Sequence, residues 1–571
     1  MNRRDFLTNA TVIGGTLAIS GCKSTSLQAV SSPGKIKNSV PMELNADVII
    51  AGGGMGGCAA ALACCRNGMS VIMTEETDWI GGQLSSQGVP PDEHPWIETH
   101  GAPKSYQNFR ARVRDYYRNN YPLTDAARSK ANLNPGDGAV SRLCHEPRVA
   151  VSVLNDMLMP YISTGKLKIL LSHKIKSADV TGDKVNALMM INTLNGDELL
   201  LSGKYFVDAT ECGDLLPITG TEYITGTESK SDTGELHAAD KADPTNNQAF
   251  TVCFAMDYQP GVDNVKEPPR NYNFWKNYVP DLTPAWSGRL LDLSYSNPSD
   301  LKPKRLEFDP TGRSFGSVLN LWNYRRVINK NNFVPGTYES DISIVNWPQN
   351  DLIPGNLIDV SENEFNDSVT KGKELSAALF YWLQTEVPRA DGKQGWPGLR
   401  LRGDIMGTND GMAKYPYIRE SRRIKAEFRI LEEHVGAKNR ALVAGEIEGK
   451  KAADFYDSVG VGYYHIDLHP SSNGNNYIDF PSLPFQIPLG ALLPVRMNNL
   501  LPANKNIGTT HITNGCYRLH PVEWSIGEAV GCLISFADKK RVPPRAVREN
   551  RKMLSDFQSE IKKQGIETIW P

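Results

Sequence analysis

The chain has 571 residues, of which 40% are hydrophobic and 22% are charged, and its formal net charge is -2. This length allows a large core and more than one domain, and the composition is that of an ordinary globular protein. The nearly balanced charge lacks the basic excess of nucleic-acid-binding proteins, so we expect no nucleic acid partner.

The N-terminal segment has the pattern of an export signal. Arg3 and Arg4 precede a weakly apolar run over residues 10–19, which is shorter than the roughly 20 residues of a membrane-spanning helix. The paired arginines resemble a twin-arginine signal, and the segment ends at Cys22 in a sequence similar to a lipobox, in which the cysteine is acylated. The alternatives are an ordinary signal peptide or an N-terminus whose arginines have no targeting role.

We therefore expect residues 1–22 to be a twin-arginine lipoprotein-type signal. Residues 23–44, which are rich in Ser, Lys and Pro, are expected to be a flexible tether. The exported protein would be periplasmic or at the cell surface, with a membrane tether through Cys22. The twin-arginine route carries folded proteins, which points to a cofactor inserted in the cytoplasm.

A strand–helix–strand pattern follows in ADVIIAGGGMGGCAAALACCRNGMSVIMTEE, which begins at Ala46. Residues 48–51 are typical of a buried parallel strand, residues 58–67 are predicted to be a helix and residues 70–74 a second strand. The first loop has glycines in the spacing GxGxxG, and an acid stands 18 positions after the last glycine. A lone GxGxxG is weak, but in this context it predicts a dinucleotide site. The predicted contact residues are Gly52, Gly53, Gly54, Met55, Gly56, Gly57, Glu75 and Glu76.

The nine cysteines include no CxxC pair, so we expect neither a zinc site nor a disulfide framework. Cys58, Cys64 and Cys65 lie on the predicted helix, where a buried free cysteine behaves as a small apolar residue.

Three further segments bear on the choice between NAD and FAD. They are WIGGQLSSQG (79–88), YFVDATECGDLL (205–216) and NLLPANKNIGTTHITNGCYRLHPVEWSIGEAVG (499–531). In this order they resemble the segments around the cofactor in the bacterial FAD-dependent oxidoreductase family, within the glutathione-reductase-like flavoproteins. The resemblance implies FAD as the cofactor, with its adenine near residues 173–175. It implies contacts from Gly82, Gln83, Leu84, Ser85, Ile175, Ala209, Thr210, Gly213, Asp214 and Val522.

The resemblance also implies an α/β fold. A three-layer Rossmann-like FAD-binding domain, with a parallel sheet and an antiparallel meander, would hold an inserted α+β substrate or cap domain. We assign the FAD-binding domain to residues 45–220 and 490–540, the inserted domain to residues 221–489, and a C-terminal helical tail to residues 541–571.

Local patterns add detail to these domains. Residues 167–172, 184–192 and 197–207 alternate in polarity and are predicted to be antiparallel strands. A helix is predicted over residues 422–434.

A flavin enzyme that oxidises an alcohol needs a proton acceptor, because the flavin takes only the hydride. Histidine titrates closest to neutral pH. His511 and His520, with Arg518 between them, lie in the segment expected beside the flavin and are candidate catalytic residues. The alternative for each histidine is a structural bond to loop backbone.

Two more segments carry candidates for the reaction. His465, Asp467 and His469 alternate in YYHIDLHP and would share one face of a strand. This set matches a two-His, one-carboxylate metal site, but the chemistry requires no metal and we expect none. His469 is therefore a candidate substrate or catalytic residue, with loop-ordering contacts as the alternative. Arg419 is a candidate anchor for an anionic or polyhydroxylated substrate, with an internal Arg–Glu network as the alternative.

The chain has one dinucleotide fingerprint and no second one for NAD(P)H. We therefore predict an FAD-dependent oxidoreductase, a dehydrogenase or oxidase, that transfers a hydride between a polar small-molecule substrate and flavin N5. A carbohydrate-derived compound is one option for the substrate, and oxygen, a quinone, a cytochrome or another redox protein would accept the electrons. The alternatives are a flavin-dependent reductase fed by a partner, and a non-redox flavoprotein with a hydratase or binding role.

Overall fold

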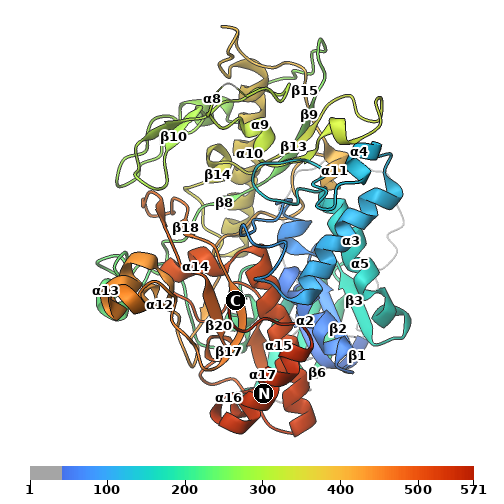
Figure 1. Ribbon diagram of the computed structural model, residues 1–571, viewed down its shortest axis with the longest axis vertical. Coiled ribbons are helices and arrows are strands. Elements are labelled where there is room, and N and C mark those ends of the chain that lie inside the picture. The colour runs from blue at the N-terminus through green and yellow to red at the C-terminus, as the bar shows by residue number, and fades with distance from the viewer. Residues whose placement is uncertain (1–41, 315) are drawn as a thin grey trace, which may run out of the picture.

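The computed structural model describes residues 42–314 and 316–571, which form an upper and a lower body in Figure 1. The expected signal, with Cys22, lies outside the described residues. Strand β1 (Met42–Ala51) begins at the first described residue, so residues 42–44 of the expected tether belong to a strand instead. Within the described part, no helix combines the length and the apolar character needed to cross a membrane.

The lower body is built on a seven-stranded mixed sheet with the order β3-β2-β1-β6-β5-β4, and β21 pairs with β6. Strands β3, β2, β1, β6 and β21 are parallel, and β6, β5 and β4 form an antiparallel meander. The prediction of a mixed α/β fold with a parallel sheet is confirmed. The strand bounds are β2 (Val71–Glu75), β3 (Leu167–Leu171), β4 (His173–Thr181), β5 (Lys184–Asn192), β6 (Glu198–Asp208) and β21 (Leu500–Pro502).

The central strand β1 is buried on both faces of the sheet. Val48 and Ile50 belong to the core on the helix side, whereas Ile49 and Ala51 belong to the core on the meander side. Because successive side chains of a strand point to opposite faces, a strand covered on both sides needs a continuous apolar run. The sequence VIIA meets this requirement.

Helices α2 (Met55–Arg66) and α15 (His520–Lys540) lie side by side against this sheet (Figure 1). Glycines allow the close approach. A Cβ atom added at Gly527 would lie 2.0 Å from the carbonyl oxygen of Gly56, and one added at Gly531 would lie 2.6 Å from that of Ala60. Two segments 471 residues apart in the chain (527 − 56) are therefore in backbone contact.

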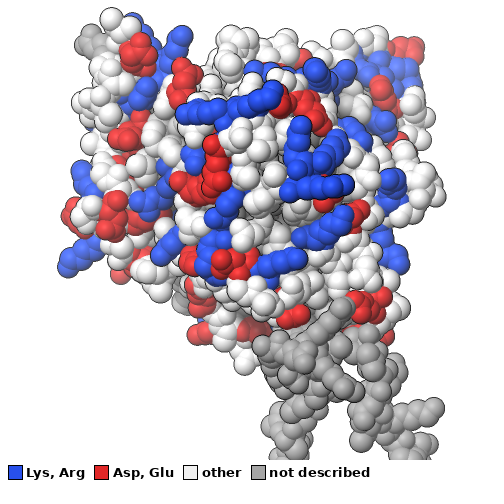
Figure 2. Space-filling view, turned by 90° about the horizontal axis from the view of Figure 1, so that it is seen from below, with Lys and Arg blue, Asp and Glu red and all other residues white. Residues whose placement is uncertain are grey.

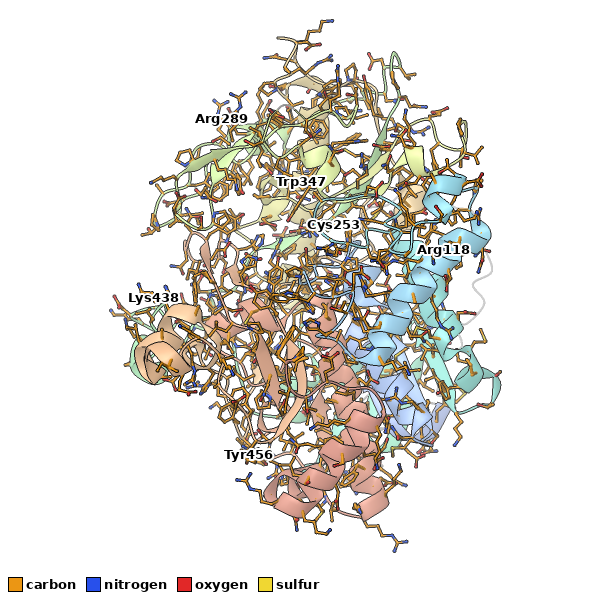
Figure 3. All side chains as sticks on the ribbon, in the orientation of Figure 1. Arg118, Cys253, Arg289, Trp347, Lys438 and Tyr456 are labelled. Atoms are coloured by element: carbon orange, nitrogen blue, oxygen red, sulfur yellow. The ribbon has the colours of Figure 1, made fainter. Side chains whose placement is uncertain are left out.

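The upper body has a second sheet and a second hydrophobic core. The four strands β12 (Arg326–Ile328), β13 (Ile342–Val345), β9 (Phe254–Tyr258) and β15 (Leu399–Leu401) are antiparallel, and the long helix α10 (Glu362–Thr385) contributes Leu375 and Leu379 to the same core. In Figure 3, Trp347 marks this body, and Cys253 lies lower, toward the middle of the molecule.

Part of the range assigned to the substrate domain packs elsewhere. Ile430, Val459 and Phe485 lie in the core of the lower body rather than in the second core. The paired strands β17 (Ser458–Gly462) and β20 (Phe485–Pro488) belong to this region, and β17 contacts α15. Much of the range from Ile430 to Leu489 is therefore joined by packing to the large sheet, whereas Tyr477 belongs to the second core.

Two strand assignments are corrected. Residues 167–171 form β3, which is parallel to β2 and not antiparallel. This strand follows helix α5 (Pro147–Ser163), and a crossover helix is the usual connection to a parallel neighbour. The antiparallel partner of β5 is β4, which the sequence patterns missed.

The helix predicted over residues 422–434 is wrong. The segment is extended and becomes helical only in α12 (Glu432–Val435). The N–H group of Ile430 donates to the carbonyl oxygen of Gly508 at 2.9 Å, a long-range bond that replaces a local helical one.

The C-terminal tail contains α16 (Pro544–Glu549) and α17 (Arg551–Lys563), and α17 buries Phe557 and Ile561. The eight described cysteines are free and buried, as expected for the three on α2. On the face shown in Figure 2, acidic and basic side chains are interspersed.

The remaining elements are α3 (Lys104–Asn120), α4 (Asp125–Arg128), α6 (Leu215–Thr219), β7 (Tyr223–Ile224), α7 (Lys230–Thr233), β8 (Phe250–Thr251), α8 (Tyr272–Asn277), β10 (Ser294–Ser296), β11 (Pro303–Arg305), α9 (Leu321–Tyr324), β14 (Asp351–Leu352), α11 (Gly403–Met406), β16 (Arg423–Ile424), α13 (Ala437–Glu448), β18 (Ile466–Leu468), β19 (Ile478–Phe480) and α14 (His511–Tyr517).

Candidate active site

A cavity lies at the C-terminal ends of β1, β2 and β6. Parallel strands run in one direction, so their carboxyl ends meet at one edge, where α/β sheets bind their ligands. Several predicted contact residues line this cavity: Gly52, Gly54, Glu75, Glu76, Gly82, Ile175, Ala209, Thr210 and Asp214.

The glycine loop after β1 forms one wall of the cavity. Gly52 has a φ of +95°, and a Cβ atom there would lie 2.2 Å from the carbonyl oxygen of Ala209, so no other residue fits. Gly54 precedes α2, which begins at Met55 and points its N-terminus at the cavity. The free N–H groups and the dipole of a helix N-terminus favour an anion such as a phosphate.

The acid at the end of β2 is fixed by the same loop. One carboxyl oxygen of Glu75 accepts a hydrogen bond from the N–H of Gly53 at 3.0 Å, and the other accepts from Thr77. Burial raises the pKa of Glu75 to about 7, and that of Glu76 also to about 7. A buried carboxyl group at this position is suited to bind ribose hydroxyls.

The second glycine segment forms a short 3₁₀ helix, Gly82–Leu84, beside the first. The amide of Gln83 donates to the backbone oxygen of Arg518 at 3.0 Å and to the carboxyl group of Glu523, at the start of α15. Burial raises the pKa of Glu523 to about 8. Lys505 forms an ion pair with Glu211, which lines the cavity.

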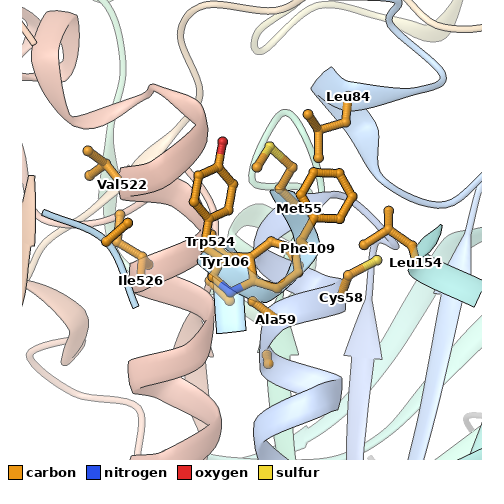
Figure 4. Close-up of a cluster of buried hydrophobic side chains, with 14 of the residues drawn as sticks. Met55, Cys58, Ala59, Leu84, Tyr106, Phe109, Leu154, Val522, Trp524 and Ile526 are labelled. Carbon is orange, nitrogen blue, oxygen red and sulfur yellow. The ribbon is translucent and has the colours of Figure 1, made fainter. Parts of the chain in front are cut away.

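Some predicted contact residues point elsewhere. Figure 4 shows Met55, Leu84 and Val522 in a cluster of buried hydrophobic side chains, so only their backbone is free to face a ligand. The hydroxyl of Ser85 donates to the carbonyl oxygen of Ile80 at 2.6 Å. Gly213, with a φ of +68°, lies against Ser421 and Arg422.

The lining also contains residues that the sequence reasoning missed, namely Thr74, Ser86, Met190, Glu211 and Tyr415. Thr74 and Glu211 are neighbours of predicted residues in the chain, and that proximity was the available signal. Met190 comes from the meander and Tyr415 from the region after the second sheet, and no local pattern marks either of them.

The two histidines expected beside the flavin are held by structural contacts. His520 is fully buried; its Nδ1 accepts from the N–H of Asp92 at 3.1 Å, and its Nε2 lies 3.3 Å from the carbonyl oxygen of Val89. Burial lowers the pKa of His520 to about 4. His511 begins α14, with Nδ1 at 2.9 Å from Glu420.

The other candidates lie together where the two bodies meet. His469 places Nδ1 at 2.6 Å from Oδ2 of Asp351, and Arg419 lies 3.0 Å from the same carboxylate. Asp467 is 3.6 Å from Nε2 of His469 and 2.9 Å from Arg518. The structure therefore brings His469, Arg419 and Arg518 into one buried cluster.

The residues of the cavity fit a dinucleotide. Backbone space at Gly54 and Gly82, a helix N-terminus and a buried acid are the features that bind pyrophosphate and ribose. Among residues 42–314 and 316–571, no group of three His, Cys, Asp or Glu side chains is placed to hold a metal ion.

Residues 47–561 match the family described as FAD dependent oxidoreductase. No curated protein matches the chain. Solved structures that share similarity include L-proline dehydrogenase from P. horikoshii, which is 15% identical over 33% of this chain and 24% of its own, with a TM-score of 0.17.

Two further solved structures are similar. The glycerol-3-phosphate dehydrogenase from Bacillus halodurans, complexed with FAD, is 14% identical over 37% of this chain and 40% of its own, with a TM-score of 0.22. The quinol fumarate reductase of E. coli is 10% identical over 92% of this chain and 74% of its own, with a TM-score of 0.31. The chain spans less than half the length of the two dehydrogenases.

The family match covers both glycine segments, the acid after β2 and the α15 region that together enclose the cavity. The chain belongs to the family described as FAD dependent oxidoreductase, with FAD as its cofactor.

Proposed function

We propose that this enzyme oxidises a polar C–OH group, such as that of a carbohydrate-derived compound, and that His469 accepts the hydroxyl proton. FAD, when bound, supplies the hydride acceptor at its N5 atom. The substrate loses a hydride from carbon and a proton from oxygen, and a C=O bond forms. The observation that carries the proposal is the pair of the half-buried His469 and the buried Asp351, beside Asp467 and Arg518.

The Nε2 atom of His469 has only the long contact with Asp467, whereas both ring nitrogens of His520 contact backbone groups at 3.1 and 3.3 Å. When Nδ1 of a neutral imidazole donates its proton to Asp351, Nε2 is an acceptor. The nearest carboxylate to this Nε2 is that of Asp467 at 3.6 Å, which is beyond hydrogen-bond distance. The side chain of His469 keeps 17% of its surface exposed, so a substrate can reach it.

The surrounding charges support proton uptake at this histidine. Burial acts to raise the pKa of Asp351, but Arg419 and His469 outweigh it and hold that pKa below its usual value. At Asp467, burial is likewise outweighed by His469 and Arg518, and the pKa is lowered. Two ionised carboxylates therefore flank His469 and stabilise the imidazolium that forms when it takes a proton.

A chain of contacts links this cluster to the cavity. Arg518 donates to Asp467 at 2.9 Å, and its backbone oxygen accepts from Gln83 at 3.0 Å. Gln83 directly follows Gly82, which lines the cavity. The proposed proton acceptor is thus connected through Asp467, Arg518 and Gln83 to the wall of the cavity.

The fate of the electrons and the location are part of the proposal. With one dinucleotide fingerprint, we propose oxygen, a quinone or a redox protein as the acceptor, and no NAD(P)H. We propose export by the twin-arginine route with an acyl anchor at Cys22, supported by the sequence pattern of residues 3–22.

Anaerobic stopped-flow reduction tests the function. The FAD-loaded enzyme is mixed with soluble sugars and sugar acids, and bleaching of the flavin absorption band identifies the substrate. His469→Asn is expected to slow the bleaching by roughly 10²–10⁴-fold while FAD stays bound, because it removes the general base.

His237→Asn is the matched control. His237 forms a similar pair with Glu432, with 2.7 Å between Nδ1 and Oε1, but it lies outside the cluster. We expect this variant to reduce its flavin at the wild-type rate. Wild-type bleaching that requires a reduced redox partner would instead support the reductase alternative, and an unchanged rate in His469→Asn would refute the assignment of the base.

A further inference from the structure

Glu211 places its carboxylate in the space that the glycine segments leave for a cofactor. A Cβ atom added at Gly54 would lie 2.9 Å from Oε1 of Glu211, and one added at Gly82 would lie 2.7 Å from the same atom. This oxygen is therefore wedged between the two glycine segments, in front of the N-terminus of α2. It is buried and accepts no hydrogen bond.

The other oxygen of Glu211 forms an ion pair with Lys505. Lys505 is 1% exposed and lies in the loop after β21, behind Glu211, which lines the cavity. Its ammonium group also donates to the side-chain oxygen of Asn504 at 3.1 Å, and the Asn504 amide in turn lies 3.5 Å from the added Cβ of Gly54. A buried cation and an anion thus meet at the point where a helix N-terminus favours a phosphate.

The balance of charge at this point favours replacement of Glu211 by a stronger anion. Burial raises the pKa values of Glu75, Asp214 and Glu523, and the charge of Glu211 adds to the effect at all three. A pyrophosphate would bring further negative charge into the same space, where like charges repel strongly. Lys505 cannot be left without an anion, because an unpaired buried charge is strongly destabilising.

We propose that Lys505 is the cation that binds the pyrophosphate of FAD, and that Glu211 takes the place of this anion in the cofactor-free protein. Binding of FAD displaces the Glu211 carboxylate from between Gly54 and Gly82, and Lys505 exchanges one anion for the other. The buried lysine therefore has a partner both before and after the cofactor binds.

Titration of the cofactor-free protein tests this exchange. FAD is added to apo-protein and binding is followed by the quenching of FAD fluorescence. Glu211→Gln keeps the size of the side chain and removes its charge, so we expect FAD to bind at least about tenfold more tightly. We expect Lys505→Met to bind FAD at least about tenfold more weakly.

Two smaller ligands show whether a gain in affinity comes from the pyrophosphate or from the rest of the FAD molecule. ADP carries a pyrophosphate and should gain affinity in Glu211→Gln, whereas adenosine carries none and should not. Thermal unfolding gives a readout without a ligand: Glu211→Gln should lower the midpoint of the apo-protein, because Lys505 loses its partner, and should leave that of the FAD-loaded protein unchanged.

Glu222→Gln is the control, because Glu222 pairs with Arg496 at 2.7 Å outside the cavity. The proposal is overturned if Glu211→Gln binds FAD with unchanged or lower affinity, or if adenosine gains as much as ADP. Because this variant alone decides the question, a failure of Lys505→Met to fold does not affect the test.

Discussion

The close backbone contacts that α2 makes with α15 and with the segment after β21 predict a graded response to glycine replacement. A Cβ atom added at Gly56, Gly527 or Gly531 would lie 1.5, 2.0 or 2.6 Å from a backbone carbonyl oxygen. Restoring an ordinary 3.4 Å contact requires shifts of about 1.9, 1.4 and 0.8 Å, the differences from 3.4 Å. Overpacking of this kind costs about 1–3 kcal/mol or more, and alanine returns up to about 1 kcal/mol of helix propensity.

We therefore expect the free energy of unfolding to fall by about 3 kcal/mol in Gly56→Ala, about 2 in Gly527→Ala and about 1 or less in Gly531→Ala. Gly56→Ala should also lose FAD, because the atom it meets belongs to Ala503, two residues before Lys505. Urea denaturation of the apo-protein and the flavin absorbance per chain measure both effects.

The control for this series is Gly372→Ala on α10, where the added Cβ meets only side-chain atoms, at 3.0 Å. These atoms can move, so we expect a change below about 1 kcal/mol. An unchanged stability and FAD content in Gly56→Ala, or a greater loss in Gly531→Ala than in Gly56→Ala, would refute the reasoning.

Three further predictions concern the site and the anchor. The pKa of Glu523 is raised from 4.5 to about 8, so the folded protein holds a proton there that the unfolded chain has lost. The unfolding free energy of the apo-protein should therefore fall between about pH 4.5 and 8, and Glu523 should contribute at most about 1.4 kcal/mol per pH unit to this fall, beside the contributions of Glu75 and Glu76. In urea titrations at several pH values, Glu523→Gln should make the slope shallower by this contribution, and an unchanged slope would contradict it. Asp351→Asn should slow flavin reduction at least about tenfold without loss of FAD, because it removes the partner that orients His469. The pH dependence of the reduction rate should also change, and an unaltered pH dependence in anaerobic stopped-flow would contradict this role. Cys22→Ser should move the protein from the membrane fraction to the soluble fraction, and an unchanged distribution would exclude the acyl anchor.

The part of the fold that the sequence predicts is the part governed by neighbours in the chain. The run VIIA, the glycine spacing and the acid at Glu75 all lie within one strand–helix–strand unit. In that unit the side-chain period and the backbone needs of Gly52 determine the structure locally. The strand β5 was also predicted with its observed bounds, 184–192.

Errors arose where distant segments provide the hydrogen bonds. The segment 422–434 has no strong helix-breaking residue, yet Ile430 pairs with Gly508 and the chain stays extended. Strand β3 looks like its antiparallel neighbours in sequence, and only the crossover through α5 makes it parallel. A local sequence pattern determines neither the pairing of Ile430 with Gly508 nor the direction of β3.

The residues of the site also differ in whether neighbours in the chain identify them. Glu75 could be identified because its position follows from its distance to the glycines. Glu211 is also a carboxylate at the cavity, but its role depends on Lys505, which lies 294 positions away in the chain. The pair between His469 and Asp351 spans 118 positions and joins segments that only folding brings together.

The cofactor cavity is encoded locally and the charged cluster is not, because the two are built from different parts of the fold. The large sheet supplies the glycine backbone and the helix N-terminus, which any ligand with a pyrophosphate can use. The ionised cluster is assembled from β14, β18 and the junction of α14 and α15, so its geometry depends on how the two cores pack against each other. A change at the contact between the bodies should therefore alter the geometry around His469, the proposed proton acceptor, while it leaves cofactor binding intact.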